Sequence, residues 1–232
     1  MAKEKILIVE DEEDIQELIR YNLEKEGFCN LQVVDSGEGA LETLKTFSPD
    51  LILLDLMLPG MDGLALCRQL KSVPDTAAIP IIMLTAKSEE TDIIIGLEMG
   101  ADDYIAKPFS NKVLVARIKS VLRRRKQNLA DDDAAGVLKR GGLVMNRGKR
   151  EVTLNGSAVI MTFSEFEILY MLARRPGWVF TRNQIVNEVK GDDYPVTERA
   201  IDVQIVGLRK KLKGAEDMIE TVRGVGYRFK ND

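Results

Sequence analysis

The 232-residue chain contains no histidine and only two cysteines. Without histidine, the chain by itself offers neither a Ser-His catalytic pair nor a histidine-ligated metal site. Cys29 and Cys67 lack the short spacing of metal-binding cysteines, so we expect buried thiols rather than a zinc site or a disulfide framework. No apolar run approaches the roughly 18 to 20 residues that cross a bilayer, and we expect no secretory leader, because the sequence does not open with a charged, then apolar, then small-residue pattern. These absences predict a soluble, cytoplasmic protein with no membrane partner.

Charge divides the chain into an acidic and a basic half. Residues 1–122 contain 12 basic and 22 acidic side chains, a net charge of −10, whereas residues 139–232 contain 17 and 12, a net charge of +5. Such an asymmetry favours two domains with different partners. The basic run at 123–126 is typical of a helix C-terminus, with a nucleic-acid contact as the alternative, and the polar residues after it indicate a linker. We expect domains at 1–124 and 138–232, joined by a linker at 125–137.

Four apolar runs in the acidic half predict the buried strands of a parallel sheet. The runs are 6–9, 51–54, 81–84 and 104–106. Stretches of helical period separate them, as with Ile15, Ile19 and Leu23, and parallel strands need crossover helices of this kind. The pattern predicts an α/β fold with an open, doubly wound sheet of about five βα units.

Each of these runs ends in side chains suited to phosphoryl chemistry. They are Glu10 and Asp11, Asp55, Thr85, and Lys107. Because the ligand crevice of a doubly wound sheet lies at the carboxyl ends of its strands, we expect these side chains to meet. Clustered carboxylates repel one another unless a cation neutralises them, and an all-oxygen set suits Mg²⁺. Asp55 would be the nucleophile, while Lys107 and Thr85 would bind phosphoryl oxygens.

Each of these side chains, taken alone, has a simpler structural explanation. The acidic residues at 10–14 could be the favourable first turn of a helix, and an aspartate after a strand is often a helix cap. The joint placement of acids, threonine and lysine on successive strand ends is what favours a phosphorylatable aspartate.

The motifs around these residues are specific. They read ILIVEDE at 6–12, DLMLPGMDG at 55–63, LTA at 84–86 and GADDYIAKPF at 100–109. In these motifs, residues 3–124 resemble the receiver domain of bacterial two-component response regulators. The resemblance implies a doubly wound (βα)5 flavodoxin-like receiver, with Asp55 as the phosphoacceptor and Lys107 as a phosphate contact.

The same resemblance implies further roles. The Mg²⁺ ligands would be Glu10, Asp11, Asp55 and the backbone carbonyl of Met57. Thr85 and Tyr104 would form a switch pair, and the Lys107-Pro108 bond would be cis. The phosphoryl donor would be a sensor histidine kinase. Because this chain has no histidine, the phosphohistidine must belong to that other protein.

Activated receivers of this family pair through their fourth helix, fifth strand and fifth helix. Relatives commonly have an arginine at the position of Ile93 and a glutamate at that of Val113, whereas both are apolar here. We hypothesise that an Ile93–Val113 contact replaces the ion pair and makes the homodimer less sensitive to salt. Simple core packing of the isoleucine run at 93–95 is the alternative. The remaining ion pairs of the dimer face would come from Asp102, Asp103, Arg117 and Lys119.

The basic half begins with segments of alternating polarity. Strands are expected at 143–145, 150–154 and 158–161, the last two joined by Asn155-Gly156, a strong hairpin signal. Three amphipathic helices are expected next, opening at 162–164, at Thr181 and near Thr197, followed by a strand-turn-strand hairpin over 219–229. Three helices and a basic hairpin describe an α+β winged helix-turn-helix domain. Such a domain places a helix in the major groove of DNA and a hairpin tip beside it.

Four motifs of this half resemble the effector domain of OmpR/PhoB-type transcription factors. They are TFSEFEIL at 162–169, RNQI at 182–185, RAIDVQIVGLRKKL at 199–212 and TVRGVGYRF at 221–229. The DNA contacts would be Arg199, Gln204, Arg209, Lys210, Arg223 and Arg228, although such charges can also be an ordinary solvated surface. Residues 190–196 match the loop that in this family can touch RNA polymerase. Val206-Gly207 departs from relatives with basic residues there, so the preferred DNA site is expected to differ.

The resemblance implies a transcription regulator controlled by phosphorylation. The kinase would phosphorylate Asp55, the receivers would pair, and two effector domains would bind promoter DNA together. The chain would accept the phosphoryl group and dephosphorylate itself without turning over an external substrate. A haloacid-dehalogenase-like enzyme would need a second acid where Met57 stands. A regulator that binds DNA independently of phosphorylation, with a merely structural receiver, is the alternative.

Overall fold

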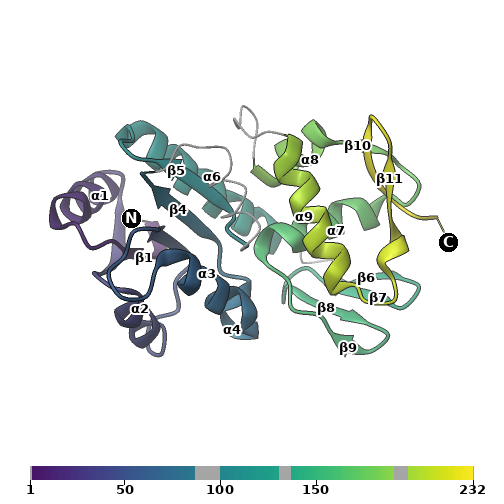
Figure 1. Ribbon diagram of the computed structural model, residues 1–232, viewed down its shortest axis with the longest axis horizontal. Coiled ribbons are helices and arrows are strands. Elements are labelled where there is room, and N and C mark those ends of the chain that lie inside the picture. The colour runs from purple at the N-terminus through teal and green to yellow at the C-terminus, as the bar shows by residue number, and fades with distance from the viewer. Residues whose placement is uncertain (1, 87–99, 131–136, 191–197, 232) are drawn as a thin grey trace. The chain divides into compact units, whose positions relative to one another are not determined.

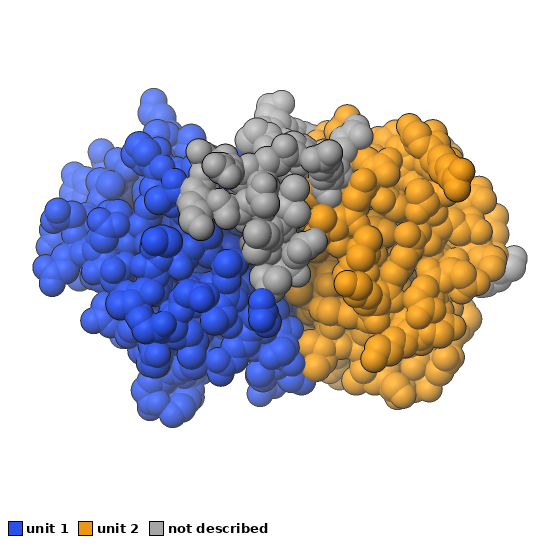
Figure 2. Space-filling model, in the orientation of Figure 1, with its two compact units in different colours: residues 1–123 blue, residues 124–232 orange. Residues whose placement is uncertain are grey.

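The computed structural model describes residues 2–86, 100–130, 137–190 and 198–231. The chain divides into two compact units, Met1–Arg123 and Arg124–Asp232, which are coloured separately in Figure 2. Within the described ranges, none of the helices combines the length and the apolar character that a membrane crossing needs.

The first unit is a five-stranded parallel sheet with helices on both faces (Figure 1). Its strands are β1 (Ala2–Val9), β2 (Phe28–Val34), β3 (Leu51–Asp55), β4 (Ile81–Thr85) and β5 (Asp103–Ala106), in the order β2-β1-β3-β4-β5. The described helices are α1 (Glu13–Lys25), α2 (Gly37–Thr43), α3 (Gly63–Ser72), α4 (Pro74–Ala77) and α6 (Asn111–Ala130). This is the doubly wound, flavodoxin-like sheet predicted from the sequence.

Alternation along the strands supplies two cores, one on each face of the sheet. On β1, Ile6 and Ile8 pack toward α1 and α6, whereas Leu7 and Val9 pack toward α2 and α3. Every residue of the central strands β3 and β4 is buried. A strand covered on both faces must be apolar throughout, which explains why these runs were readable in the sequence.

The edge strand β2 was not among the apolar runs. It has a neighbour on one side only, and of its residues only Phe28 is fully buried. Cys29, the next residue, is exposed. The expectation of buried thiols is therefore wrong for Cys29, because its side chain points away from the core, and correct for Cys67.

In its described residues after α6, the second unit contains two small sheets and three α-helices. A four-stranded antiparallel sheet is formed by β6 (Val137–Arg140), β7 (Leu143–Asn146), β8 (Glu151–Leu154) and β9 (Ser157–Ala158). The helices are α7 (Phe163–Arg174), α8 (Arg182–Lys190) and α9 (Glu198–Lys211). A three-stranded sheet is formed by β10 (Phe180–Thr181), β11 (Ile219–Val222) and β12 (Gly226–Phe229), with β12 in the middle, and a short 3-10 helix, η2 (Glu216–Met218), precedes β11. This order confirms the winged helix-turn-helix, and residues 219–229 are called the wing below.

Two boundaries differ from the sequence expectation. The strand expected at 158–161 ends at Ala158, because Thr162 already caps the next helix. Helix α6 continues to Ala130, so the basic run at 123–126 lies inside it rather than at its end, and the expected linker at 125–137 begins as helix. Arginine, lysine, glutamine, leucine and alanine are good helix formers, which accounts for this extension. The residues at 131–136 lie outside the described ranges.

Thr162 begins α7 with a reciprocal cap. Its hydroxyl accepts a hydrogen bond from the Glu165 N–H at 3.2 Å, and the Glu165 carboxylate accepts one from the Thr162 N–H at 2.7 Å. Because the substitution Thr162→Ala leaves a helix N–H without its partner, it should lower the free energy of unfolding by about 1 kcal/mol. Urea unfolding followed by the fluorescence of Trp178, the one tryptophan, measures this. Ser157→Ala, at an exposed position in β9, is the control and should change little.

Candidate phosphorylation site and DNA-binding surface

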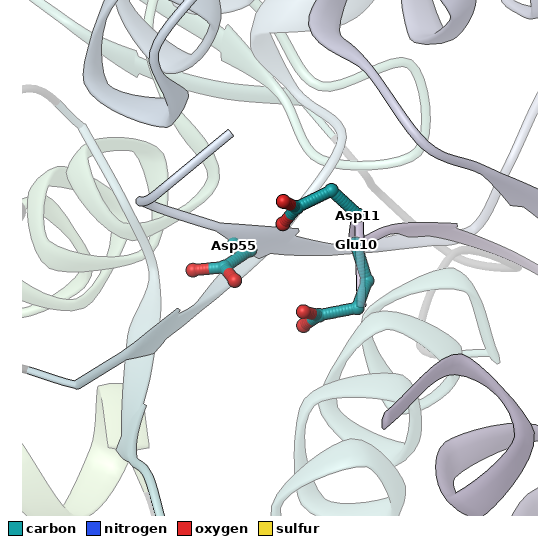
Figure 3. Close-up of side chains that lie close together, drawn as sticks. All are labelled: Glu10, Asp11 and Asp55. Atoms are coloured by element: carbon teal, nitrogen blue, oxygen red, sulfur yellow. The ribbon is translucent and has the colours of Figure 1, made fainter. Parts of the chain in front are cut away.

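Three carboxylates converge at the carboxyl ends of β1 and β3. Val9 pairs with Leu54 across these two strands, so the residues that follow them begin side by side. Figure 3 shows the carboxylates of Glu10, Asp11 and Asp55 gathered around a common space, and one oxygen from each lies within 4.8 Å of the others. Glu10 and Asp55 are buried whereas Asp11 is exposed, so solvent reaches the cluster from the side of Asp11.

Lys107 closes the cluster from the loop after β5. Its ammonium lies 2.6 Å from an Asp55 carboxylate oxygen and 2.8 Å from one of Glu10. Burial raises the pKa of Glu10 to about 7, against the lowering effect of its hydrogen bond from Lys107. Burial alone would lower the pKa of Lys107, but its hydrogen bonds to Asp55 and Glu10 outweigh this and raise it. The Lys107-Pro108 bond is cis, as the resemblance implies.

The donor set fits a hard divalent cation. Oε2 of Glu10 is buried and has no hydrogen-bond partner among the described residues, although a buried carboxylate oxygen needs one. All side-chain donors are oxygens, the ligands that Mg²⁺ prefers. Gln16 donates from its side chain to the Glu10 carbonyl at 2.5 Å and thereby positions the strand end. The sequence analysis missed Gln16, whose only signal is a polar residue on the inner side of α1.

The loop after β3 is held against Asp55. The Met57 N–H donates to Oδ1 of Asp55 at 3.0 Å. A Cβ at Gly63 would lie 2.1 Å from the Asp55 carbonyl oxygen, which explains the glycine that ends the motif at 55–63. On the neighbouring strands, Thr85 is buried at the end of β4, and Tyr104 of β5 is partly buried with the Arg117 guanidinium 6.0 Å from its ring. Burial raises the pKa of Tyr104, so its hydroxyl stays protonated.

The expected ion pairs of the dimer face are satisfied within one chain. Asp102 is buried and accepts a hydrogen bond from Lys71 at 2.9 Å, so the expectation that it binds a second chain is wrong. Asp103, also buried, forms an ion pair with Arg117 at 2.9 Å. A carboxylate that enters a core needs a cation beside it, and in both cases a neighbouring helix supplies the cation.

The outer part of the same face is described in part. Lys119 forms an ion pair at 2.5 Å with Glu26, the residue that caps the C-terminus of α1. Val113 is exposed on α6, as a dimer contact would require. Ile93 lies outside the described residues, so the Ile93–Val113 contact stays a prediction.

Helix α9 is amphipathic, as expected, and its buried side is formed by Ile201, Ile205 and Leu208, with Leu212 buried just beyond its end. Gln204 is only 5% exposed, so the expectation that it contacts DNA is wrong. On the helical wheel residue 204 stands next to the buried Leu208, at the margin of the buried side, and therefore faces inward. Lys210 is exposed, and the side chain of Arg199 lies outside the described residues, as does the loop at 191–197.

The arginines near the wing divide into two kinds. Arg209 donates to the Ile219 carbonyl at 3.1 and 2.6 Å and to the Thr221 hydroxyl at 2.9 Å, so it holds the wing against α9 rather than projecting outward. Arg228 forms an ion pair with Glu220 at 2.6 Å. Arg223, in the turn between β11 and β12, is exposed and projects into solvent.

A network that the sequence analysis missed joins the wing to the helices. The Tyr227 hydroxyl donates to Asp202 at 2.7 Å, and Arg182 donates to the same carboxylate oxygen at 2.7 Å. The guanidinium of Arg182 also lies 5.1 Å from the Tyr227 ring. All three residues fall inside the motifs that carry the resemblance, but their partners are far apart in the chain, so no local pattern shows the contact.

Comparison with known proteins decides the family. The model of the response regulator receiver domain matches residues 6–119, and that of the transcriptional regulatory protein, C terminal, matches residues 156–229. Over 225 residues the chain is 44% identical to the phosphate regulon transcriptional regulatory protein PhoB of Rhizobium meliloti, covering 96% of this chain and 97% of that protein. The chain belongs to the two-component response regulators of the OmpR/PhoB type. Members of this family are DNA-binding transcription regulators rather than enzymes, and this response regulator is controlled through its receiver domain.

Other relatives agree along the whole length. The DNA-binding response regulator MtrA of Mycobacterium tuberculosis is 41% identical over 229 residues, with 97% of this chain and 96% of that protein covered. A solved mutant of RitR superposes with a TM-score of 0.82 at 27% identity, covering 99% of this chain and 100% of that chain. The OmpR/PhoB homologue DrrB of Thermotoga maritima has a TM-score of 0.50 at 30% identity, with the same coverage.

Proposed function

We propose that this response regulator is switched by phosphorylation of Asp55, with Mg²⁺ bound beside it, and that the switch controls binding of the winged helix-turn-helix to promoter DNA. The observation that carries the proposal is the convergence of the Glu10, Asp11 and Asp55 carboxylates, with Lys107 2.6 Å from Asp55. A nucleophile, a cation site and a positive side chain for the phosphoryl oxygens then lie together.

In the transfer step, an Asp55 carboxylate oxygen attacks the phosphorus of a phosphohistidine on the sensor histidine kinase. The P–N bond breaks, and its electron pair returns to the histidine nitrogen. Glu10, Asp11, Asp55 and the Met57 carbonyl would hold Mg²⁺, which supplies positive charge to the phosphoryl oxygens. Lys107 binds the same oxygens, and the Thr85 hydroxyl donates to them. Attack by water on the aspartyl phosphate would restore Asp55 without any external substrate.

The aspartyl phosphate acts on the rest of the receiver through its charge. It adds about −1.5 to −2 elementary charges at the end of β3. Thr85 and Tyr104 move toward this charge, and the face that carries Val113 becomes competent to pair with a second receiver. Pairing brings two winged domains to adjacent half-sites, which raises affinity for DNA through effective concentration.

On DNA, the exposed Lys210 and Arg223, together with Arg199, would contact the duplex, while Arg209 and Arg228 would act mainly by holding the wing. Residues 190–196 would contact RNA polymerase. We place the protein in the cytoplasm, because that is where it would meet promoter DNA, RNA polymerase and the phosphohistidine of its kinase.

The test uses acetyl phosphate as a small phosphodonor and intact-mass spectrometry of the full chain. With Mg²⁺ the chain should gain the mass of one phosphoryl group, and with EDTA it should gain none, because the carboxylate cluster then repels the donor. Light scattering with Mg²⁺ and beryllofluoride should show a dimer. No mass gain in Mg²⁺, with DNA binding unaffected by the phosphodonor, would instead support a regulator that works without phosphorylation.

A further inference from the structure

The outward side of α9 is apolar in its middle. Helical period places residues 203, 206 and 210 opposite the buried Ile205 and Leu208, and residue 213 lies just beyond the end of the helix. Val206 is 49% exposed, and Lys210 and Lys213 are exposed C-terminal to it. A valine therefore occupies the centre of the side that a recognition helix presents to the major groove.

The polar side chains on the two flanks of α9 are already engaged. On one flank, Asp202 accepts from the Tyr227 hydroxyl at 2.7 Å, and Arg209 donates to the Ile219 carbonyl at 2.6 Å. On the other flank, Lys211 forms an ion pair with Glu165 of α7 at 2.5 Å. Among the described apolar side chains in the middle of α9, Val206 is the most exposed, since Val203 is half-buried.

The fold does not require the pair Val206-Gly207. Val206 is too exposed to contribute to a core, and β-branched side chains are poor helix formers. Within 4 Å, a Cβ at Gly207 would meet only a carboxylate oxygen of Glu165, at the ordinary van der Waals distance of 3.4 Å, so alanine would fit. Val206 and Gly207 are thus two poor helix formers that internal packing does not require. We infer that a binding partner of this surface, rather than the fold, determines these two residues.

The chemistry of Val206 selects one feature of DNA. Valine forms no side-chain hydrogen bond, and thymine alone among the bases presents a methyl group in the major groove. The flanking positive charges of Lys210, Lys213 and Arg223 suit the phosphates on either side. We propose that Val206 packs against the 5-methyl group of a thymine in each half-site and so determines part of the sequence specificity. This inference rests on the proposed binding of α9 in the major groove.

The test begins with the full chain, Mg²⁺ and beryllofluoride, which select binding sequences from a random double-stranded library. Each thymine of the selected DNA is then replaced by uracil, which lacks only the methyl group. One or two replacements per half-site should raise Kd about three- to fivefold, because burying one such group is worth ~0.8 kcal/mol and a tenfold change is ~1.4 kcal/mol. Fluorescence anisotropy of labelled duplexes measures Kd for the thymine duplex and for the uracil duplex.

Two matched variants identify the residue responsible. Val206→Ala should fold, since the side chain is exposed, and should bind the thymine and uracil duplexes equally. Val137→Ala, at a 47% exposed valine of β6, should keep the wild-type difference. Equal binding of both duplexes by the wild type, or a difference that persists in Val206→Ala, would overturn the inference. Failure to select any sequence would contradict DNA binding itself, and this inference with it.

Discussion

Asp55→Asn should abolish both phosphorylation by acetyl phosphate and the dimer induced by beryllofluoride. Asparagine has nearly the shape of aspartate, but its amide is not a nucleophile, and losing a nucleophile costs at least about a thousandfold in rate. The side chain is 2% exposed, yet the variant should fold, because Lys107 keeps its ion pair with Glu10 at 2.8 Å. Mass spectrometry and light scattering on the full chain measure the two losses.

A second aspartate separates this effect from a general loss of negative charge. Asp75 lies exposed in the first turn of α4, outside the carboxylate cluster. Asp75→Asn should therefore accept the phosphoryl group and pair as the wild type does. If Asp55→Asn still gained a phosphoryl group at the wild-type rate, another residue, with the exposed Asp11 as first candidate, would be the acceptor and the assignment of Asp55 would be wrong.

Lys71→Met should destabilise the receiver by about 3 to 5 kcal/mol, a large part of the roughly 5 to 15 kcal/mol that holds a domain folded. Lys71 and Asp102 are 4% and 2% exposed, and their charged groups lie 2.9 Å apart. The ammonium also donates to the carbonyls of Ala77 and Ile79, at 3.2 and 2.6 Å, which ties the end of α3 to the end of α4 and the segment before β4. Removing the ammonium leaves a buried carboxylate without its cation, and that is the costly state.

The single tryptophan makes this prediction specific to one unit. Trp178 belongs to the second unit, so its fluorescence reports the winged domain, whereas circular dichroism reports both units. In urea, Lys71→Met should shift the circular dichroism transition and leave the fluorescence transition in place. The double variant Lys71→Met with Asp102→Leu should lose less than Lys71→Met alone, because no buried charge remains.

Lys119→Met serves as the matched control for lysine removal. Lys119 and Glu26 also form an ion pair, but both side chains are largely exposed, at 51% and 41%. Water solvates such charges when the partner is removed, so the unfolding midpoint should stay close to that of the wild type. If Lys71→Met and Lys119→Met lowered the urea midpoint of the circular dichroism transition equally, burial would not strengthen the Lys71–Asp102 pair.

The sequence was sufficient to predict structure wherever a local pattern of residues determines whether a segment is buried. Uninterrupted apolar runs identified β3 and β4, because a strand covered on both faces has no polar position before its carboxyl end. Shorter apolar stretches identified β1 and β5 in part. The convergence of Glu10, Asp55 and Lys107 followed in turn, because parallel strands deliver their carboxyl ends to one edge of the sheet. The edge strand β2 escaped this reasoning, since a half-exposed strand needs no such run.

Tertiary structure alone decided which charges are available to partners. Three polar residues are of types usually found at the surface, namely Asp102, Gln204 and Arg209. The first two are nevertheless buried, and the third is bound to the wing. Their partners, such as Lys71 and the Ile219 carbonyl, are brought to them by packing between elements, which leaves no signal at the spacing of a helix or a strand. The phosphorylation chemistry is therefore readable along the chain, because it follows from residue type at strand ends. The surfaces for receiver pairing and for DNA binding can be identified only from the tertiary structure, because they depend on which polar side chains already form hydrogen bonds or ion pairs within the chain.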